Sequence, residues 1–551
     1  MPILCFVLAA PVLAAWQASP SSLTIRAADA SPAPAPGAAC ASCHQQIYDR
    51  YRETPMARAS GPAADGWLPA DFLHAASAIH YRVYLEDGKV WLSYRRDDPS
   101  RPLDGKQRLE YFLGSGKRGR TYLFEQDGYW FEAPINWYAK KQLWDMAPAY
   151  QQTREAPLTL PVDPGCLHCH ASGVASSLSD ARNRYAGAPF ATGGITCEAC
   201  HGDAQPHLAS GGKTHMPDLD ALPTVRRDSV CLNCHLEGQA EVNRLGKRPE
   251  DFRPGDNLFD YAVFFVHRGE SGSGGRATSQ YEALLKSRCK QQSGDKLTCT
   301  TCHDPHASPA PDQRVAFYRA RCLECHAAMS QTHHPENQDC TVCHMARPPS
   351  NDIAHEQVTD HWIRRRVSQD SLPLVTTGEL LTVGGAPASD RDLGLAYAQM
   401  AVRGDQAAGE RAKKLLESAE AQTAGAPADH ALHAQLGFLD QVAGHPEAAE
   451  QEYRKALNAD PNDAVAAGNL ALLDAGAHRY AEAMRLWSAV FARDPVELGA
   501  GFNLAVVQCG AGQRDRALAT LDRILRFAPD NDRARTMAHD IRAGKQPCAA
   551  R

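Results

Sequence analysis

Beyond its first residues, this chain of 551 residues has no long apolar run. Residues 3–16 are apolar but too few to span a bilayer, and no other stretch reaches the about 18 consecutive apolar residues of a membrane helix. The early run is typical of a secretory signal peptide, although no Lys or Arg precedes it as in the usual pattern. The sequence predicts a signal peptide within residues 1–30, export to the periplasm or extracellular space, and membrane association only through partners.

A strong charge imbalance is also missing. The chain has 58 Lys and Arg against 64 Asp and Glu, a formal net charge of −6. Nucleic-acid binding depends on a basic surface, so no nucleic acid is expected as a partner.

Cysteines outside one repeated motif are few. The chain has 18 cysteines, and those that lie elsewhere are Cys5, Cys289, Cys509 and Cys548. Their scattered positions argue against a disulfide framework. We expect them to be small buried or exposed thiols.

What the chain has in abundance is the pentapeptide C-x-x-C-H, which occurs seven times. The composition alone would produce about 0.03 copies, so the repetition is not chance. We number the motifs 1 to 7 in chain order. They occupy residues 40–44, 166–170, 197–201, 231–235, 299–303, 322–326 and 340–344.

This spacing fits covalent haem attachment. Two cysteines on one helical turn form thioethers to the haem vinyl groups, and the adjacent His binds the iron. Zinc sites and redox dithiols also use C-x-x-C, but neither requires a His after the second Cys every time. The sequence therefore predicts seven covalently attached haem c groups. The expected thioether cysteines are Cys40, Cys43, Cys166, Cys169, Cys197, Cys200, Cys231, Cys234, Cys299, Cys302, Cys322, Cys325, Cys340 and Cys343, and the expected proximal iron ligands are His44, His170, His201, His235, His303, His326 and His344.

Composition divides the chain into regions. Residues 31–366 carry all the motifs, residues 367–390 are a Pro- and Gly-containing linker, and residues 391–551 are rich in Ala and Leu. The predicted fold class is mainly α: an irregular multihaem cytochrome c region with a small antiparallel β insert, followed by an α-solenoid.

The β insert is expected at about residues 78–135. Asp87-Gly88 and Asp127-Gly128 separate aromatic and apolar runs, which is a strong hairpin signal. Basic residues follow at Lys117-Arg118-Gly-Arg120 and Lys140-Lys141.

The tail repeats with a period of 34 residues. Pro461, Pro495 and Pro529 mark this period, which resembles that of the tetratricopeptide repeat. Three repeats are expected at 430–463, 464–497 and 498–531, with a degenerate repeat at 391–424 and a capping helix at 532–545. Stacked helix pairs present a surface that binds a protein or peptide.

The haem-bearing region resembles cytochrome c-554-like multihaem proteins. This resemblance rests on the opening blocks, Cys40-Ala-Ser-Cys-His-Gln-Gln-Ile-Tyr and Thr54-Pro-Met-Ala-Arg-Ala. The later blocks are similar to those of multihaem cytochromes with a tetratricopeptide tail: Cys197-Glu-Ala-Cys-His-Gly, Cys299-Thr-Thr-Cys-His-Asp-Pro-His306, and Cys340-Thr-Val-Cys-His-Met345 followed by Thr359-Asp-His361-Trp-Ile. In the c-554-like family a His often stands where this chain has Met56.

The resemblance implies which side chains fill the sixth iron position. Two imidazoles give a closed, low-potential iron, a thioether raises the potential, and a missing ligand leaves the iron open. Eleven histidines compete for seven places. The resemblance favours His74, His207, His306, His334, His355 and His361, with His215 next and Met56 as a further candidate.

Two functions remain open. The first is an exported electron carrier that exchanges electrons with redox partner proteins and docks through its tail. The second is an oxidoreductase that acts on a small nitrogen or sulfur compound at one open haem. The surplus of histidines and the lack of a C-x-x-C-K motif favour the carrier, with no catalytic residue assigned.

Overall fold

The computed structural model describes residues 37–148, 150–179, 181–268, 280–333, 338–345, 347, 359–365, 378–423 and 428–548. They belong to one compact unit. The predicted signal peptide lies outside the described residues. No helix among the described residues is long and apolar enough to cross a membrane.

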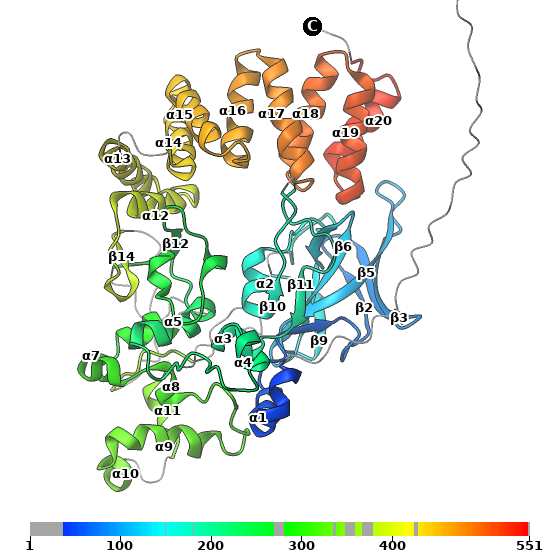
Figure 1. The fold of residues 1–551 in the computed structure, drawn as a ribbon. Helices are drawn as coiled ribbons and strands as arrows, with labels where there is room; N and C mark the ends of the chain where they lie inside the picture. The colour runs from blue at the N-terminus through cyan, green and yellow to red at the C-terminus, as the bar shows by residue number, and fades with distance from the viewer. Residues whose placement is uncertain are drawn as a thin grey trace, which may run out of the picture. The chain divides into compact units, whose positions relative to one another are not determined.

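A nine-stranded antiparallel sheet follows motif 1 (Figure 1). The strand order is β2-β3-β4-β5-β6-β8-β9, with β1 paired to β5 and β7 paired to β6. The expected small insert at 78–135 is therefore wrong in extent. The strands are β1 (Ser60–Pro62), β2 (Ala70–His74), β3 (Ile79–Glu86), β4 (Lys89–Arg96), β5 (Leu103–Leu113), β6 (Gly119–Gln126), β7 (Tyr129–Glu132), β8 (Ile135–Tyr138) and β9 (Leu143–Met146).

Both predicted hairpins are confirmed. Glu86 pairs with Lys89 across Asp87-Gly88, and β6 pairs with β7 across Asp127-Gly128. All four turn residues have positive φ, which Asp and Gly tolerate in a two-residue turn. Alternate residues of β3 and β4 point into one apolar core of Tyr, Phe, Leu and Val side chains.

Short helices carry the haem motifs. The cysteines of each motif lie on one helical turn, as the spacing predicts. The motif-bearing helices are α1 (Ala38–Tyr51), α2 (Pro164–His170), α3 (Cys197–His201), α5 (Thr224–His235), α8 (Cys299–Cys302), α9 (Arg314–His326) and α11 (Cys340–His344). The helices of this region without a motif are α4 (Gln205–Ala209), α6 (Gln280–Leu285), α7 (Arg288–Ser293) and α10 (Met329–Thr332).

Two small sheets lie between these helices. One pairs β10 (Ala171–Val174) with β11 (Phe190–Gly193). The other has the order β12 (Ala240–Asn243), β13 (Ala262–His267) and β14 (Leu380–Thr382). The third of these strands falls inside the predicted linker, whose described residues begin at 378.

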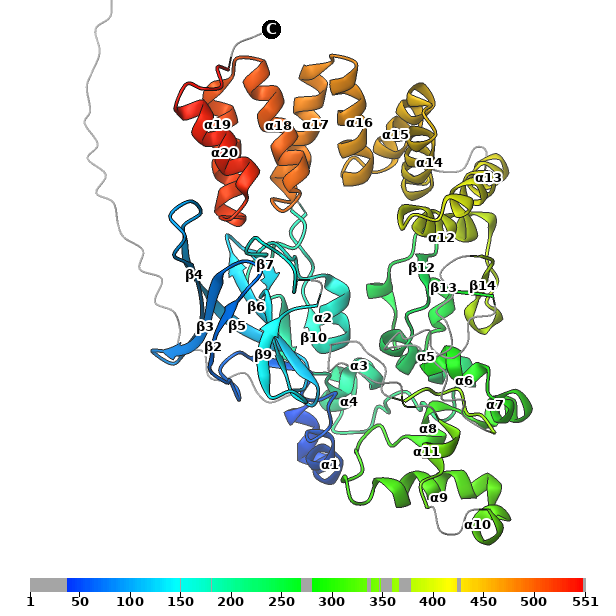
Figure 2. The same cartoon turned by 180° about the vertical axis from the view of Figure 1, so that it is seen from behind.

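The tail consists of helix pairs, seen from both sides in Figures 1 and 2. Helices begin at His430, Ala464 and Leu498, as the 34-residue period predicts, and Gly437 lies so close to Tyr453 that a Cβ would meet its ring at 2.7 Å. The helices are α12 (Asp390–Val402), α13 (Gln406–Gln422), α14 (His430–Val442), α15 (Pro446–Ala459), α16 (Ala464–Gly476), α17 (Tyr480–Arg493), α18 (Leu498–Gly510), α19 (Arg514–Phe527) and α20 (Asp532–Arg542).

The tail contacts the rest of the chain through its first helix, α12, and through the ends of α17 and α19. Arg244 donates a 2.7 Å hydrogen bond to Asp392 of α12, beside a shared apolar core. Phe527 of α19 belongs to the core of the large sheet, and Arg96 of β4 forms a buried ion pair with Asp530.

A disulfide corrects one expectation. Cys509 of α18 is bonded to Cys548 at the end of the described chain, 39 residues later. These two cysteines are therefore not free thiols. The bond links the end of α18 to the segment that follows α20.

Candidate haem centres

The motifs are neighbours in space in a definite order. Cysteine side chains show this order, because a cysteine of one motif alters the pKa of a cysteine in the neighbouring motif. Burial raises the pKa of Cys197 to about 11, and the nearby Cys40 adds to this rise. Motifs 1 and 3 therefore lie side by side. Burial raises the pKa of Cys200 to about 11, and the nearby Cys231 adds to this rise. Motif 3 therefore lies beside motif 4.

Motif 4 has two further neighbours. A hydrogen bond with Cys299 of motif 5 lowers the pKa of Cys231. A hydrogen bond with Cys234 of motif 4 lowers the pKa of Cys169 in motif 2. His168, inside motif 2, accepts a 2.6 Å hydrogen bond on Nε2 from Asn233. Motif 4 therefore adjoins motifs 2, 3 and 5.

The last three motifs continue the series. Burial raises the pKa of Cys302 in motif 5, and Cys325 of motif 6 adds to this rise. Burial raises the pKa of Cys322 in motif 6 to about 12, and the nearby Cys340 of motif 7 adds to this rise. The order of contacts is thus 1, 3, 4, 5, 6, 7, with motif 2 attached to motif 4.

Four proximal histidines each face a second histidine. In each pair one residue belongs to a C-x-x-C-H motif and the other comes from elsewhere in the chain. The distances between ring centroids are 6.4 Å for His44 and His207, 5.9 Å for His201 and His306, 6.1 Å for His303 and His361, and 5.8 Å for His344 and His333.

These distances fit an iron atom between two imidazoles. Two metal–nitrogen bonds of about 2 Å on one axis, plus half of each ring, place the centroids about 6 Å apart. Direct ring stacking would bring the rings closer. The donor set, two imidazoles beside two cysteines on one helical turn, suits haem c.

Hydrogen bonds orient several of these rings. The Nδ1 of His207, His361 and His344 lies 2.7, 3.0 and 2.7 Å from the backbone oxygens of Thr214, Thr359 and Arg364. When Nδ1–H donates to a carbonyl, the lone pair is left on Nε2, the atom that binds a metal.

Burial favours the neutral form of four histidines of the haem region, His201, His235, His303 and His361. It is the main cause that lowers the pKa of His303 to about 4, and His361 adds to the effect. Burial also lowers the pKa of His201, His235 and His361. A neutral imidazole is the form that can bind iron.

Other expected ligands lie differently. His74 is buried in β2, its Nδ1 2.7 Å from the Ser77 hydroxyl and its Nε2 3.0 Å from the Gln151 carbonyl oxygen. Both ring nitrogens of His74 lie within hydrogen-bonding distance of these oxygens, and its assignment as a distal ligand stays a prediction. The candidates His334 and His355 lie outside the described residues.

Met56, His215 and His333 complete the comparison. Met56 is half-buried in the turn after α1, and its carbonyl accepts a 3.0 Å hydrogen bond from the Ile195 amide. His215 is exposed. The structure brings His333 to His344, although the resemblance favours the neighbouring His334. The adjacent histidines His333 and His334 were the available signal in the sequence, but adjacency does not show which of the two faces a motif.

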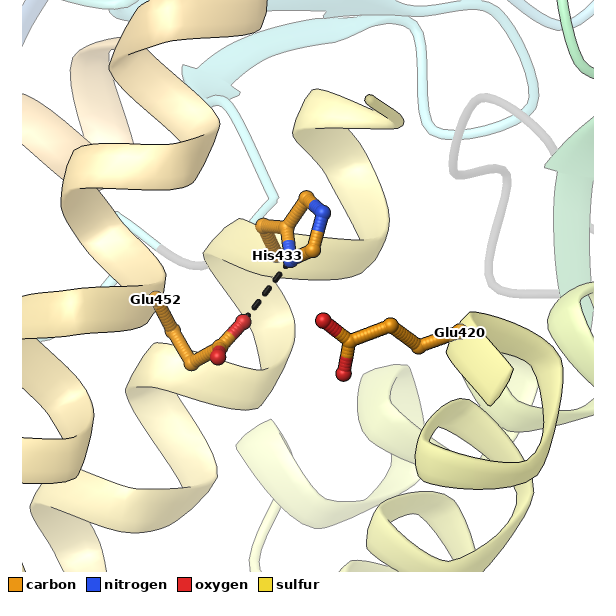
Figure 3. Close-up of side chains that lie close together, drawn as sticks. All are labelled: Glu420, His433 and Glu452. Atoms are coloured by element: carbon orange, nitrogen blue, oxygen red, sulfur yellow. Dashed lines mark hydrogen bonds and ion pairs between the residues drawn. The ribbon is translucent and has the colours of Figure 1, made fainter. Parts of the chain in front are cut away.

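Figure 3 shows a second cluster of metal-type side chains, in the tail. Glu420, His433 and Glu452 meet between α13, α14 and α15, with His433 Nδ1 2.7 Å from a Glu452 oxygen. Lys455 donates hydrogen bonds of 2.8 and 2.7 Å to the two carboxylates. Burial alone would raise the pKa of Glu452, but hydrogen bonds from His433 and Lys455 lower it. The Lys455 ammonium supplies a positive charge beside the two carboxylates, so the cluster is a network of charged side chains within the tail.

Comparisons with known proteins agree with these features. The family model for cytochrome c554 and c-prime matches residues 136–202, that for a doubled C-x-x-C-H motif matches residues 292–331, and that for a tetratricopeptide repeat matches residues 472–539.

Two relatives carry several haems. The multiheme cytochrome MtrA of Shewanella baltica is 24% identical over 29% of this chain and 52% of its own length. The nine-heme cytochrome c of Desulfovibrio desulfuricans is 35% identical over 12% of this chain and 23% of its own. The chain thus spans about half or less of these relatives. Among solved structures, a MamA structure is 21% identical with a TM-score of 0.25, over 28% of this chain and 80% of its own.

These findings define the class. The chain contains a cytochrome c554-type segment and a doubled C-x-x-C-H segment like those of multihaem cytochromes c, which implies covalently bound haem c. It carries a tetratricopeptide-repeat tail at its C-terminal end. Cytochromes of this class transfer electrons, and repeats of this kind bind proteins.

Proposed function

We propose that the chain is an exported electron carrier with seven haem c groups, six of which form a line. The observation that carries the proposal is the set of four histidine pairs with centroids 5.8 to 6.4 Å apart. Two imidazoles close an iron to substrates and favour electron transfer over catalysis.

The contacts between motifs supply the route. Electrons pass through motifs 1, 3, 4, 5, 6 and 7, and motif 2 branches from motif 4. The neighbouring cysteines support this order because each tethers the edge of a haem. Motif 2 is then an entry or exit that joins the line in its middle.

The assigned distal ligands are His207 for motif 1, His306 for motif 3, His361 for motif 5 and His333 for motif 7. The first three were favoured by the family resemblance, and the fourth replaces the adjacent His334. All four proposals rest on the ring distances given above.

The disulfide between Cys509 and Cys548 supports export. Disulfides persist in the periplasm and outside the cell, where c-type haems are also attached, and are rare in the cytoplasm. The repeat tail would hold a redox or assembly partner on its surface.

Two measurements test the proposal. The intact mass of the denatured protein should exceed that of the mature polypeptide by seven haems. The reduced protein should show little spectral change with carbon monoxide, because we propose that every iron, in the four histidine pairs and in motifs 2, 4 and 6, has a sixth ligand. Five or fewer haems would refute the count. Stoichiometric carbon monoxide binding, with turnover of nitrite or hydroxylamine, would instead support an oxidoreductase.

A further inference from the structure

Basic side chains gather at two adjacent turns of the large sheet. Lys117 and Arg118 lie in the β5–β6 turn, Arg120 is the second residue of β6, and Lys140 and Lys141 lie in the β8–β9 turn. We call these five residues the basic turn face. The turns are held together because β6 pairs with β8 and the Ala139 amide donates a 2.7 Å hydrogen bond to the Arg118 carbonyl.

This face is a local reversal of charge. Residues 114–122 and 137–142 contain no Asp or Glu, whereas the whole chain has a net charge of −6. Among the described residues, Lys117 forms no ion pair. Arg120 donates hydrogen bonds to the carbonyls of Asp65 and Gly66 but to no described carboxylate. Its Nε is buried and has no hydrogen-bond partner in the described part of the chain.

A recess opens between these residues. It has a volume of about 320 Å³ and is lined by Lys117, Arg120, Tyr122 and Trp137, among others. The Arg120 guanidinium is fixed over the Phe112 ring, 3.8 Å from its centroid. A rigid cation beside an aromatic wall is suited to receive a carboxylate from another molecule.

The β5–β6 turn, which carries part of the basic turn face, is linked to motif 2 through Ala59. The Gly114 amide, at the end of β5, donates a 2.6 Å hydrogen bond to the Ala59 carbonyl. The proximal ligand His170 places its Nδ1 3.3 Å from the same oxygen, and the Ser60 hydroxyl donates to the His170 carbonyl at 2.7 Å. The turn and the proximal ligand of the branching haem therefore share one residue as a contact.

We propose that the basic turn face docks an acidic electron-transfer protein and that electrons cross there to or from motif 2. This inference rests on the proposed carrier function. Charge complementarity identifies the partner: opposite charges steer two proteins together and orient them before transfer.

The test uses flavodoxin, a small acidic flavoprotein, reduced and mixed with the oxidised holoprotein in a stopped-flow instrument. The variant Lys117→Glu/Lys141→Glu should lower the second-order rate constant about tenfold at low salt. The loss should vanish near 0.5 M salt, where screening extends over only about 4 Å. The control Lys414→Glu/Lys545→Glu makes the same charge change on exposed tail residues and should leave the rate unchanged.

A second measurement locates the contact. Carbodiimide cross-linking of flavodoxin should yield peptides joined at Lys117, Lys140 or Lys141. The docking proposal is overturned if the two double variants lose rate equally, if neither loses any, or if cross-links form only at other lysines.

Failure of docking can be told from failure of the carrier function. Dithionite at equilibrium should reduce all haems of the wild type and of both variants. If it does so while flavodoxin shows no preference for the face, only the docking proposal is wrong. A wild type that dithionite cannot reduce would refute the carrier function itself.

Discussion

Removal of His306 should open the haem of motif 3 and no other. The His201 and His306 rings are nearly parallel, at 7°, with centroids 5.9 Å apart, which is the best-aligned of the four pairs. His306→Ala removes one of two strong-field nitrogens, so one haem in seven should change from low spin to high spin or bind water. The thioethers remain, so the haem content should not change.

Electron paramagnetic resonance and carbon monoxide titration measure the expected effect. The variant should show one high-spin haem and bind one equivalent of carbon monoxide when reduced, whereas the wild type should bind little. His306→Met should keep the iron six-coordinate and raise one midpoint potential, because a thioether ligand favours the reduced iron.

A control uses a histidine of the large sheet. His80 is exposed and bonded to Asp71. His80→Ala should leave every haem low spin. A low-spin spectrum for His306→Ala, or a high-spin haem in His80→Ala, would refute the reasoning.

Three further predictions concern the tail and motif 7. Asp530→Ala should cost about 3–5 kcal/mol in chemical unfolding, because it leaves the buried Arg96 unpaired, whereas Arg96→Met/Asp530→Leu should cost much less. Burial opposes ionisation of Asp530, but hydrogen bonds led by that from Arg96 lower its pKa; this stabilisation is therefore present at neutral pH and lost as pH falls through the lowered value. Cys548→Ser should cost up to about 4 kcal/mol, the value for a closed loop of this length, and reduced wild type should match it in thermal unfolding. His333→Ala should produce one high-spin haem, and an unchanged spin state would remove it from motif 7.

The parts of the fold that depend on neighbours in sequence were predictable. The helices of the tail begin where the 34-residue period places them, since each pair packs on the next. The Asp-Gly turns fixed two hairpins. No such turn signal marks the strands β1, β2, β8 and β9, and the sequence did not predict them. Pairing of β1 with β5 joins residues about fifty apart, and no local pattern reports it.

The candidate site divides in the same way. The motif spacing identifies thioether cysteines and proximal ligands, because those groups act within five residues. The proposed distal ligands can come from far along the chain, as His207, which faces His44, shows. A resemblance can rank such histidines, but only the folded chain shows what lies around each, as Ser77 and Gln151 lie beside His74. The disulfide was missed for a similar reason, since Cys509 and Cys548 meet only after the last helices fold.

The haems should also be needed for part of the fold. Among the described residues between 286 and 379, no apolar side chain is buried, whereas the large sheet and the tail have apolar cores of their own. The proposed ligation of one iron by His303 and His361 would join distant segments there and would offset chain entropy that apolar contacts cannot.

Protein made without haem attachment should therefore keep the sheet and the tail but lose the segment between them. Hydrogen exchange followed by mass spectrometry should show residues 286–365 unprotected, with 79–132 and 430–541 still protected. The holoprotein with His306→Ala is the control, because its haems remain covalently attached and the segment should stay protected. Protection of 286–365 in haem-free protein would mean that backbone and side-chain contacts alone hold this region, and the histidine pairs would then follow from the fold instead of helping to create it.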